Sequence, residues 1–265
     1  MNTGKLVRMN RLFSDPSGKL CSIAVDHFMI YAMGLPDGLR SIEQTIGEIV
    51  AGRPDAITMH KGIAASVWPK HAGRVPLIVQ SSLVRPDDSA RQQSATPEDA
   101  IRLGADAIAV VAFVRGQAEA AYLRTVADCV RDAARFELPV ICHIYPLDPD
   151  TNTIIFTPED VAWAVHCAVE VGVDIVKAPF CGDASAHAQI VSDCPVPIVA
   201  AGGPRAETLE MALEMMTQVM QSGARGATIG RNVWGFDRVT AAVTAFRAVI
   251  HDGKSATEAL TIAGL

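Results

Sequence analysis

The sequence has no run of lysine or arginine residues, and its formal net charge is −6. Proteins that bind nucleic acids or anionic membranes usually present a basic patch or stripe. We therefore expect no nucleic acid and no membrane as a partner, and a small molecule as the ligand.

Long hydrophobic segments are also missing. The longest apolar stretch, AIAVVAFV at 107–114, is too short to span a bilayer, and no apolar core of signal-peptide length follows the basic N-terminal residues. These features predict a cytoplasmic protein.

The six cysteines are scattered along the chain, and no two of them form a CxxC pair. A chain of 265 residues, of which 49% are hydrophobic, can bury one large core and does not need disulfide bonds. We expect reduced core cysteines and a single domain covering residues 1–265.

Short apolar runs rich in valine, isoleucine and alanine alternate with longer amphipathic stretches eight times along the chain. Runs that are apolar on both faces are typical of parallel strands covered by helices. The predicted strands lie in segments 21–27, 55–62, 75–80, 105–113, 138–146, 173–180, 196–203 and 224–232.

Helix signals fall between these runs. The segments TPEDAIRLG at 96–104 and TPEDVAWAVHCAVEVG at 157–172 both begin with a threonine N-cap, a proline and acidic residues. Segment 207–221 spaces its methionines at helical intervals, which favours packing of a helix on the sheet over a subunit interface. Eight strand–helix units predict a closed (β/α)₈ barrel, known as a TIM barrel. The alternative, an open doubly wound sheet, has no GxGxxG motif after the first strand to support it.

Lys177 stands inside the apolar run VDIVKAPF. A buried ammonium group is costly unless its charge is paired or it loses its proton. One interpretation is a nucleophile that attacks a carbonyl, and the other is a strand-end lysine that reaches solvent or pairs with Asp183. Lys61, at the end of the second predicted strand, is the rival nucleophile, but strand alternation turns it towards the helices.

The neighbouring strand carries His143 and Tyr145 on one face, because side chains alternate along a strand. A right-handed barrel places this strand beside that of Lys177. We expect Tyr145 to exchange protons with the substrate and His143 to line the pocket. A structural tyrosine with a hydrogen-bonded hydroxyl is the alternative.

Asp26 and His27 end the first predicted strand, and His60 lies near the end of the second. We expect Asp26 and His60 to be catalytic and His27 to line the substrate pocket, although a histidine at a strand end can also be structural. Asp26, His60 and His143 also suit a zinc site, but no HExxH motif supports one.

The turns AAGGP at 200–204 and TIGRN at 228–232 follow the last two strands, where barrels commonly bind phosphate through backbone amides. Arginine adds charge-assisted hydrogen bonds. The predicted phosphate-binding residues are Gly202, Gly203, Gly230, Arg231 and Arg205.

Read together, these residues resemble those of class I aldolases in the superfamily of archaeal-type fructose-bisphosphate aldolase and deoxyribose-phosphate aldolase. The resemblance covers nearly the whole chain. Its motifs are VDH at 25–27, GLPDGL at 34–39, DAITMHKG at 55–62, IYP at 144–146, DIVKAPF at 174–180, AAGGP at 200–204, GARGATIGRNVW at 223–234 and HDGKSATEAL at 251–260.

The resemblance implies that Lys177 forms the Schiff base, that Tyr145 is the acid–base residue and that Asp26 is a catalytic carboxylate. The chain departs from the pattern at 26–28, with DHF for DHG or DQG, and at 145–148, with YPLD for YPRG. Loss of that basic residue argues against fructose 1,6-bisphosphate as the substrate.

We therefore predict an aldolase that cleaves or forms a carbon–carbon bond of a phosphorylated keto substrate through Lys177. Because an imine supplies the electrophile, we expect no metal ion and no other cofactor. The alternatives are an acyl transferase (thiolase) or transaldolase on the same scaffold, and a barrel that binds a phosphorylated metabolite without catalysis. We also expect a homo-oligomer.

Overall fold

The computed structural model describes residues 2–29, 34–84 and 92–265. Eight parallel strands close into a barrel in the order β1-β2-β3-β6-β7-β8-β9-β10, and β10 pairs with β1. Each predicted strand segment overlaps one barrel strand, with β1 and β6 each extending one residue beyond the predicted bounds, so the predicted (β/α)₈ barrel is confirmed. The barrel strands are β1 (Leu20–Ala24), β2 (Ala56–His60), β3 (Leu77–Gln80), β6 (Ala107–Val114), β7 (Val140–Pro146), β8 (Ile175–Ala178), β9 (Ile198–Ala201) and β10 (Gly226–Ile229).

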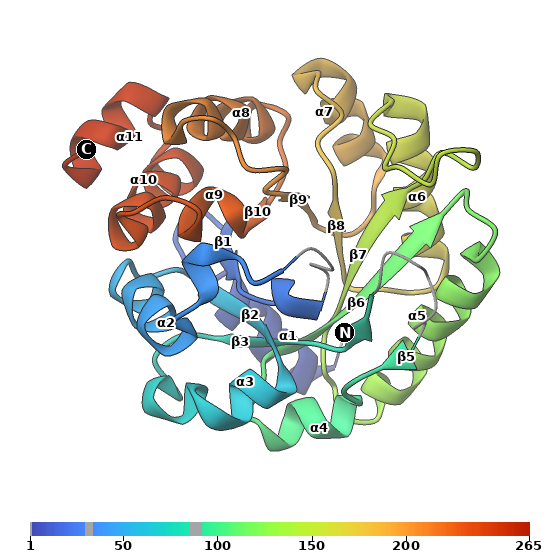
Figure 1. Ribbon diagram of the computed structural model, residues 1–265. Coiled ribbons are helices and arrows are strands. Elements are labelled where there is room, and N and C mark those ends of the chain that lie inside the picture. Colours follow the sequence, from blue (N-terminus) through green and yellow to red (C-terminus); the bar gives the residue numbers. More distant parts are fainter. Residues whose placement is uncertain (1, 30–33, 85–91) are drawn as a thin grey trace.

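Helices surround the barrel as an outer ring (Figure 1). A short antiparallel pair, β4 (Ser82–Leu83) and β5 (Gln92–Gln93), lies outside the barrel sheet. The α-helices are α1 (Thr3–Leu12), α2 (Ile42–Ala51), α3 (Lys61–Ser66), α4 (Pro97–Arg102), α5 (Glu119–Ala134), α6 (Pro158–Glu170), α7 (Ala184–Asp193), α8 (Leu209–Gln221), α9 (Arg231–Trp234), α10 (Val239–Asp252) and α11 (Ala256–Ala263). The 3₁₀ turns are η1 (His27–Met29), η2 (Asp37–Leu39) and η3 (Trp68–His71).

The two TPED segments start helices as predicted. Thr96 Oγ1 accepts a hydrogen bond from Asp99 N, and the Asp99 carboxylate accepts one from Thr96 N, so α4 begins with a complete capping box. Thr157 caps α6 by accepting from Asp160 N at 3.2 Å. Each cap satisfies a backbone donor that the helix leaves without an internal partner.

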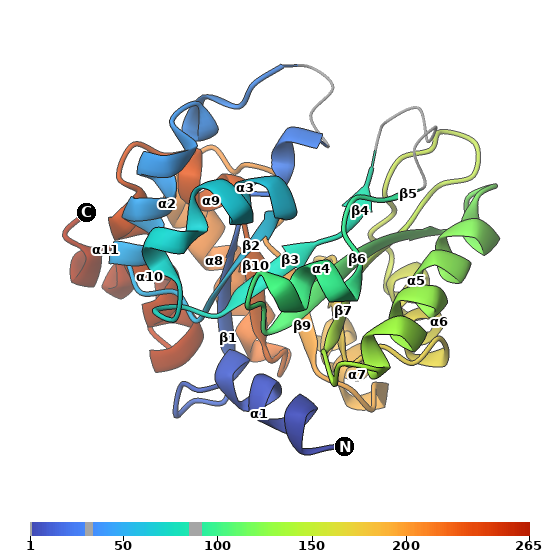
Figure 2. The same cartoon turned by 90° about the horizontal axis from the view of Figure 1, so that it is seen from below.

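The half of the barrel interior at the N-terminal ends of the strands is apolar. Side chains that point inward from the strands, including Leu20, Ile78, Ile141 and Ile175, form one buried cluster with Met9 and Leu12 of α1. Figure 2 shows α1 beneath the barrel, on the side opposite the long loops that follow the strands. Water is excluded from this end, so the polar inward side chains gather at the other end.

Outward strand residues and the helices form a second, larger core. Val173 belongs to this outer layer, because β8 begins only at Ile175 and strand alternation does not extend to Val173. On α8, Met216 is fully buried against the barrel as predicted, whereas Met211 is 49% exposed.

All six cysteines are free thiols, as expected, and three of them are buried. Among the described residues, no helix combines the length and the apolar character that crossing a membrane would require.

Candidate active site

Lys177 is the third residue of β8 and points into the barrel above Ile175. Its side chain is only 7% exposed. Within the described chain, the Lys177 Nζ atom makes no hydrogen bond and no ion pair. Asp183, the partner in the structural alternative, instead caps α7 by accepting from Ala186 N at 2.7 Å.

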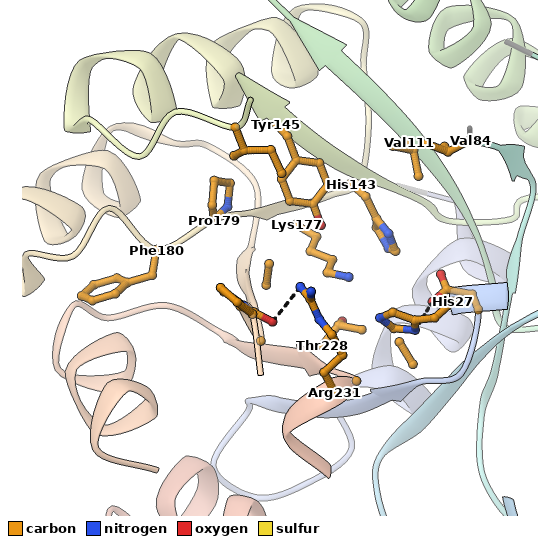
Figure 3. Close-up of a pocket in the computed structure, with 18 of the residues that line it drawn as sticks. His27, Val84, Val111, His143, Tyr145, Lys177, Pro179, Phe180, Thr228 and Arg231 are labelled. Atoms are coloured by element: carbon orange, nitrogen blue, oxygen red, sulfur yellow. Dashed lines mark hydrogen bonds and ion pairs between the residues drawn. The ribbon is translucent and has the colours of Figure 1, made fainter. Parts of the chain in front are cut away.

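Tyr145 and His143 lie on the strand next to Lys177. In the parallel pairing of β7 with β8, His143 is directly opposite Lys177. Figure 3 shows the Lys177 side chain extending into the cavity among Tyr145, His143, His27 and Arg231. The Tyr145 ring packs against Phe113 at a centroid distance of 5.9 Å. The amine, the phenol and the imidazole therefore face one cavity, as predicted.

Asp26 and His27 enter the same cavity from the end of β1. The Asp26 carboxylate is buried, and its Oδ1 atom lies 3.3 Å from His27 Nδ1. Burial alone would raise the pKa of Asp26, but the neighbouring His27 and Lys177 groups hold that pKa well below its usual range. Burial lowers the pKa of His27 to about 4, against the opposing effect of Asp26. At neutral pH the pair is thus a carboxylate beside a neutral imidazole.

His60, which we expected to be catalytic, does not line the cavity. It ends β2 against the backbone of Asp26 and Gln80 from the flanking strands, and this position accounts for its burial. Burial also lowers the pKa of His60, so the side chain is a neutral buried imidazole.

The alternative zinc site is not assembled from Asp26, His60 and His143. Among the described residues, the ligand atoms that lie within 4.8 Å of one another belong to Asp15, Asp55 and His251. These three residues lie near the N-terminal ends of the strands, where Arg247 already binds Asp55 at 3.0 Å.

Gln80 is a buried site residue that the sequence analysis missed. Its Nε2 atom donates to Asp26 Oδ2 at 3.0 Å and lies 3.3 Å from His143 Nδ1. A polar residue ending the apolar run VPLIVQ was the available signal. Its significance depends on the barrel order, in which one strand separates β3 from β1, before Asp26, and one strand separates β3 from β7, which carries His143.

The turns after β9 and β10 form one polar wall of the cavity, which Gly202, Gly203, Gly230 and Arg231 line. Arg231 Nη2 donates to Gly203 O at 3.1 Å. Gly203 has φ +72°, and a Cβ atom at Gly230 would collide with the His27 ring, so both turns require glycine.

Two further residues change the prediction for this wall. Asn232, which the sequence analysis missed, is buried and donates from Nδ2 to Gly202 O at 2.7 Å and to Pro204 O at 2.9 Å. It therefore fixes one turn against the other. Arg205 does not line the cavity, because its guanidinium packs on the Phe236 ring and its Nε atom donates to Gly235 O.

The rest of the cavity, whose volume is about 550 Å³, is largely apolar. Part of this wall comes from the loop between β7 and α6, in which Leu147 and Ile154 form an isolated bridge. The Asp148 carboxylate stabilises this loop by accepting from Asp150 N and Thr151 N. The larger apolar lining side chains are Val84, Val111, Phe113, Ile154, Phe156, Phe180 and Met215.

Comparison with known proteins agrees with this geometry. Residues 21–235 match the family model described as DeoC/LacD family aldolase. The chain belongs to this family. The predicted superfamily is thereby confirmed, as is the prediction that the protein is an enzyme of the aldolase type.

Proteins that are similar in sequence to this DeoC/LacD family member have names that describe different reactions. It is 33% identical to 2-amino-3,7-dideoxy-D-threo-hept-6-ulosonate synthase of Halobacterium salinarum, over 100% of this chain and 98% of that protein. It is 28% identical to 3-hydroxy-5-phosphonooxypentane-2,4-dione thiolase of Escherichia coli K12, over 98% of this chain and 86% of that protein.

A solved structure is similar throughout the barrel. It is an archaeal fructose-1,6-bisphosphate aldolase whose catalytic lysine is covalently bound to the carbinolamine intermediate of its substrate. The TM-score is 0.83 at 25% identity, and the match covers 93% of this chain and 99% of that one.

Proposed function

We propose that this protein is a class I aldolase that cleaves or forms a carbon–carbon bond of a phosphorylated keto substrate through a Schiff base on Lys177. The observation that carries the proposal is a buried lysine that makes no hydrogen bond and no ion pair with the described residues and faces a cavity also lined by Tyr145 and Asp26. A buried amine in such surroundings is suited to attack a carbonyl carbon.

The chemistry follows from these neighbours. The Lys177 nitrogen adds to the ketone carbon, and the carbonyl oxygen gains protons and leaves as water, which produces a protonated imine. This imine accepts the electron pair of the bond between the adjacent carbon and the carbinol carbon, and the carbinol fragment leaves as an aldehyde. Tyr145 removes the proton of the carbinol hydroxyl and returns a proton to the resulting enamine carbon. Water then hydrolyses the imine and releases the ketone.

Asp26 supports these steps as the carboxylate that lines the same cavity as the reacting amine. Because its pKa lies well below the usual range, it remains ionised at neutral pH and stabilises the positively charged imine. His27 is neutral under the same conditions and therefore adds no competing positive charge.

We propose further that the substrate carries one phosphate group. Among the described lining residues, Arg231 is the cationic side chain left for a phosphate once Lys177 is assigned to the imine. The apolar wall, which includes Phe113 and Ile154, suits a substrate portion that lacks a second charge. The departure at Leu147 and Asp148 fits this proposal, because Leu147 is buried and Asp148 organises its own loop.

The experiment is borohydride reduction of the protein with a panel of keto monophosphates and with fructose 1,6-bisphosphate, in the presence of EDTA, followed by peptide mapping. We expect an adduct on Lys177 with a monophosphate and none in Lys177→Ala. Lys61→Ala is the control, because Lys61 is an exposed residue that pairs with Asp99 at 3.2 Å outside the cavity. An adduct on Lys61, or turnover without any adduct, would overturn the mechanism.

Product analysis in the same reactions separates the alternatives. An aldehyde product supports the aldolase, whereas a new acyl ester or thioester would indicate acyl transfer, as the name of the Escherichia coli relative describes. Binding of a phosphorylated ketone without adduct or product would instead indicate a barrel without catalytic function.

A further inference from the structure

Gln80 occupies a fully enclosed position at the end of β3, and its side chain is 1% exposed. The amide oxygen Oε1 accepts a hydrogen bond from Ser82 N at 3.0 Å. Since a backbone N–H can only donate, this contact fixes which end of the amide is oxygen. The Nε2 end is therefore directed at Asp26 and His143.

The two protons of Gln80 Nε2 have separate acceptors. One is Asp26 Oδ2 at 3.0 Å, and the other is His143 Nδ1 at 3.3 Å. An amide nitrogen cannot accept, so His143 Nδ1 must be the unprotonated ring nitrogen. The remaining ring nitrogen, Nε2, then carries the proton.

The surroundings of His143 favour a neutral ring. Burial lowers the pKa of His143 well below its ordinary value, and the nearby Lys177 charge acts in the same direction. A protonated ring would also place an N–H against the Gln80 amide donor. His143 is therefore a hydrogen-bond donor through Nε2 and not a cation.

We propose that Gln80 is a positioning residue. It fixes His143 in the Nε2–H tautomer and, by binding both side chains, holds the His143 ring and the Asp26 carboxylate in place beside Lys177. This inference rests on the proposed Schiff-base function. In that reaction His143 Nε2–H donates a hydrogen bond to the oxygen of the carbon that Lys177 attacks. His143 retains its proton throughout, while Tyr145 exchanges protons with the substrate.

The geometry explains why glutamine is needed at this position. Glutamate has nearly the same shape, but an ionised carboxylate can only accept and would lie against the Asp26 carboxylate. It would draw the His143 proton to Nδ1 and leave Nε2 as an acceptor facing the cavity. Methionine has a similar length and removes both donors without adding charge.

The test uses Gln80→Glu and Gln80→Met, with Gln93→Met as the control. Gln93 is a partly buried glutamine whose Nε2 donates to Ser81 Oγ and which does not line the cavity. Nitrogen-15 NMR of labelled histidines reports which ring nitrogen is protonated, and the His143 signals are assigned by their loss in His143→Gln. Thermal unfolding establishes that each variant is folded.

We expect Nε2–H at His143 in the wild-type protein and in Gln93→Met, and Nδ1–H in Gln80→Glu. In both Gln80 variants kcat should fall by about 10- to 100-fold, by analogy with the loss of groups that orient a metal-binding histidine. KM should change little, because Arg231 and the glycine turns still hold the phosphate. If Gln80 had a purely structural role, its substitution would lower the stability of the protein and would not lower kcat selectively while KM stays nearly constant.

The inference is wrong if His143 keeps its tautomer in Gln80→Glu, or if Gln80→Met turns over as fast as the wild-type protein. Either result leaves borohydride trapping at Lys177, and hence the proposed function, untouched. Conversely, absence of a wild-type adduct would overturn the Schiff-base function, whereas the tautomer measurement needs no substrate and still tests Gln80.

Discussion

At the scale of single residues, burial decides which site groups carry charge. His27 and His143 have lowered pKa values because their rings are removed from water, so both act at neutral pH as hydrogen-bonding groups. Asp26 is equally buried, yet neighbouring charge keeps it ionised. The opposite outcomes arise because a carboxylate beside Lys177 gains attraction, whereas an imidazolium there would meet repulsion.

Tyr145→Phe tests whether proton transfer by Tyr145 is separate from imine formation at Lys177. We expect kcat to fall by about 10²- to 10⁴-fold, the usual contribution of general acid–base catalysis, because the phenol is assigned to proton transfer. Borohydride trapping at Lys177 should still occur, since Lys177 and Asp26 are intact. Steady-state kinetics and intact mass measure the two effects, and full activity of the variant would assign the proton transfer to another group.

Arg231→Met tests the phosphate site. KM for a phosphorylated substrate should rise by a factor equivalent to about 1.5–3 kcal/mol, the scale for a hydrogen bond to a charged group. Arg205→Met is the matched control, because Arg205 packs on Phe236 outside the cavity and should leave KM unchanged. Equal effects of the two substitutions would contradict the placement of the phosphate.

At the scale of elements, the loops that follow the strands shape the site. Two of these loops contain residues that differ from the sequence pattern of the family. The loop between β7 and α6 is closed by Asp148, whose carboxylate accepts from two backbone amides of the turn. Phe28, in η1, packs against the large core. Each departure thus has a structural role, and neither supplies a cation to the described cavity lining.

A buried histidine on helix α7 should make the stability of the protein depend on pH. His187 on this helix is completely buried against the Phe180 ring, and burial lowers its pKa from 6.5 to about 4. Between these two values the unfolded chain binds a proton that the native protein does not. This histidine therefore makes the free energy of unfolding fall as pH decreases from about 6.5 to about 4, by up to about 1.4 kcal/mol per pH unit.

His187→Leu should remove this contribution, so that the free energy of unfolding depends less steeply on pH in that window. Urea unfolding of both proteins at pH 7, 6 and 5 measures the two slopes. Identical slopes would show that His187 takes up its proton equally in the folded and unfolded states.

At the scale of the whole molecule, the two ends of the barrel have different tasks. The cavity lies at the C-terminal ends of the strands, whereas the other end is closed by α1 and by a polar cluster around Asp55. Asp55 accepts from Cys21 N, binds Arg247 and lies 2.9 Å from His251 Nε2. This cluster ties α10 to the starts of β1 and β2. The homo-oligomer remains a prediction, which light scattering tests directly.

Asp55→Ala should lower the free energy of unfolding by about 3–5 kcal/mol, because it removes the acceptor of the Cys21 amide and the negative charge beside the buried His251 ring and the partly buried Arg247 guanidinium. The kcat of the folded enzyme should be unchanged, since the cavity lies at the other end of the barrel. Asp37→Ala is the control: the Asp37 side chain is 90% exposed where it pairs with Arg40, and its loss should cost less than about 1 kcal/mol. A comparable loss of stability in both variants, measured by urea unfolding, would contradict the argument.

Much of the site was predictable because strand alternation and barrel order are local or topological rules. They place Lys177, Tyr145 and His143 on facing positions of adjacent strands. The same rules failed for His60, whose orientation depends on packing against the flanking strands, and for Arg205, whose long side chain reaches Phe236 instead of the cavity. Gln80 and Asn232 were missed because their importance lies in partners that are distant along the chain.

The sequence by itself determined the eight strands, their helices, the barrel and the end of it that holds the site, because apolar periodicity and helix caps act over a few residues. Only the tertiary structure decided which polar groups pair. Hydrogen bonds and pKa values depend on distances of a few ångströms between residues from different strands. Asp26 follows β1, Gln80 ends β3 and His143 lies within β7, and only the closed barrel brings these three residues together.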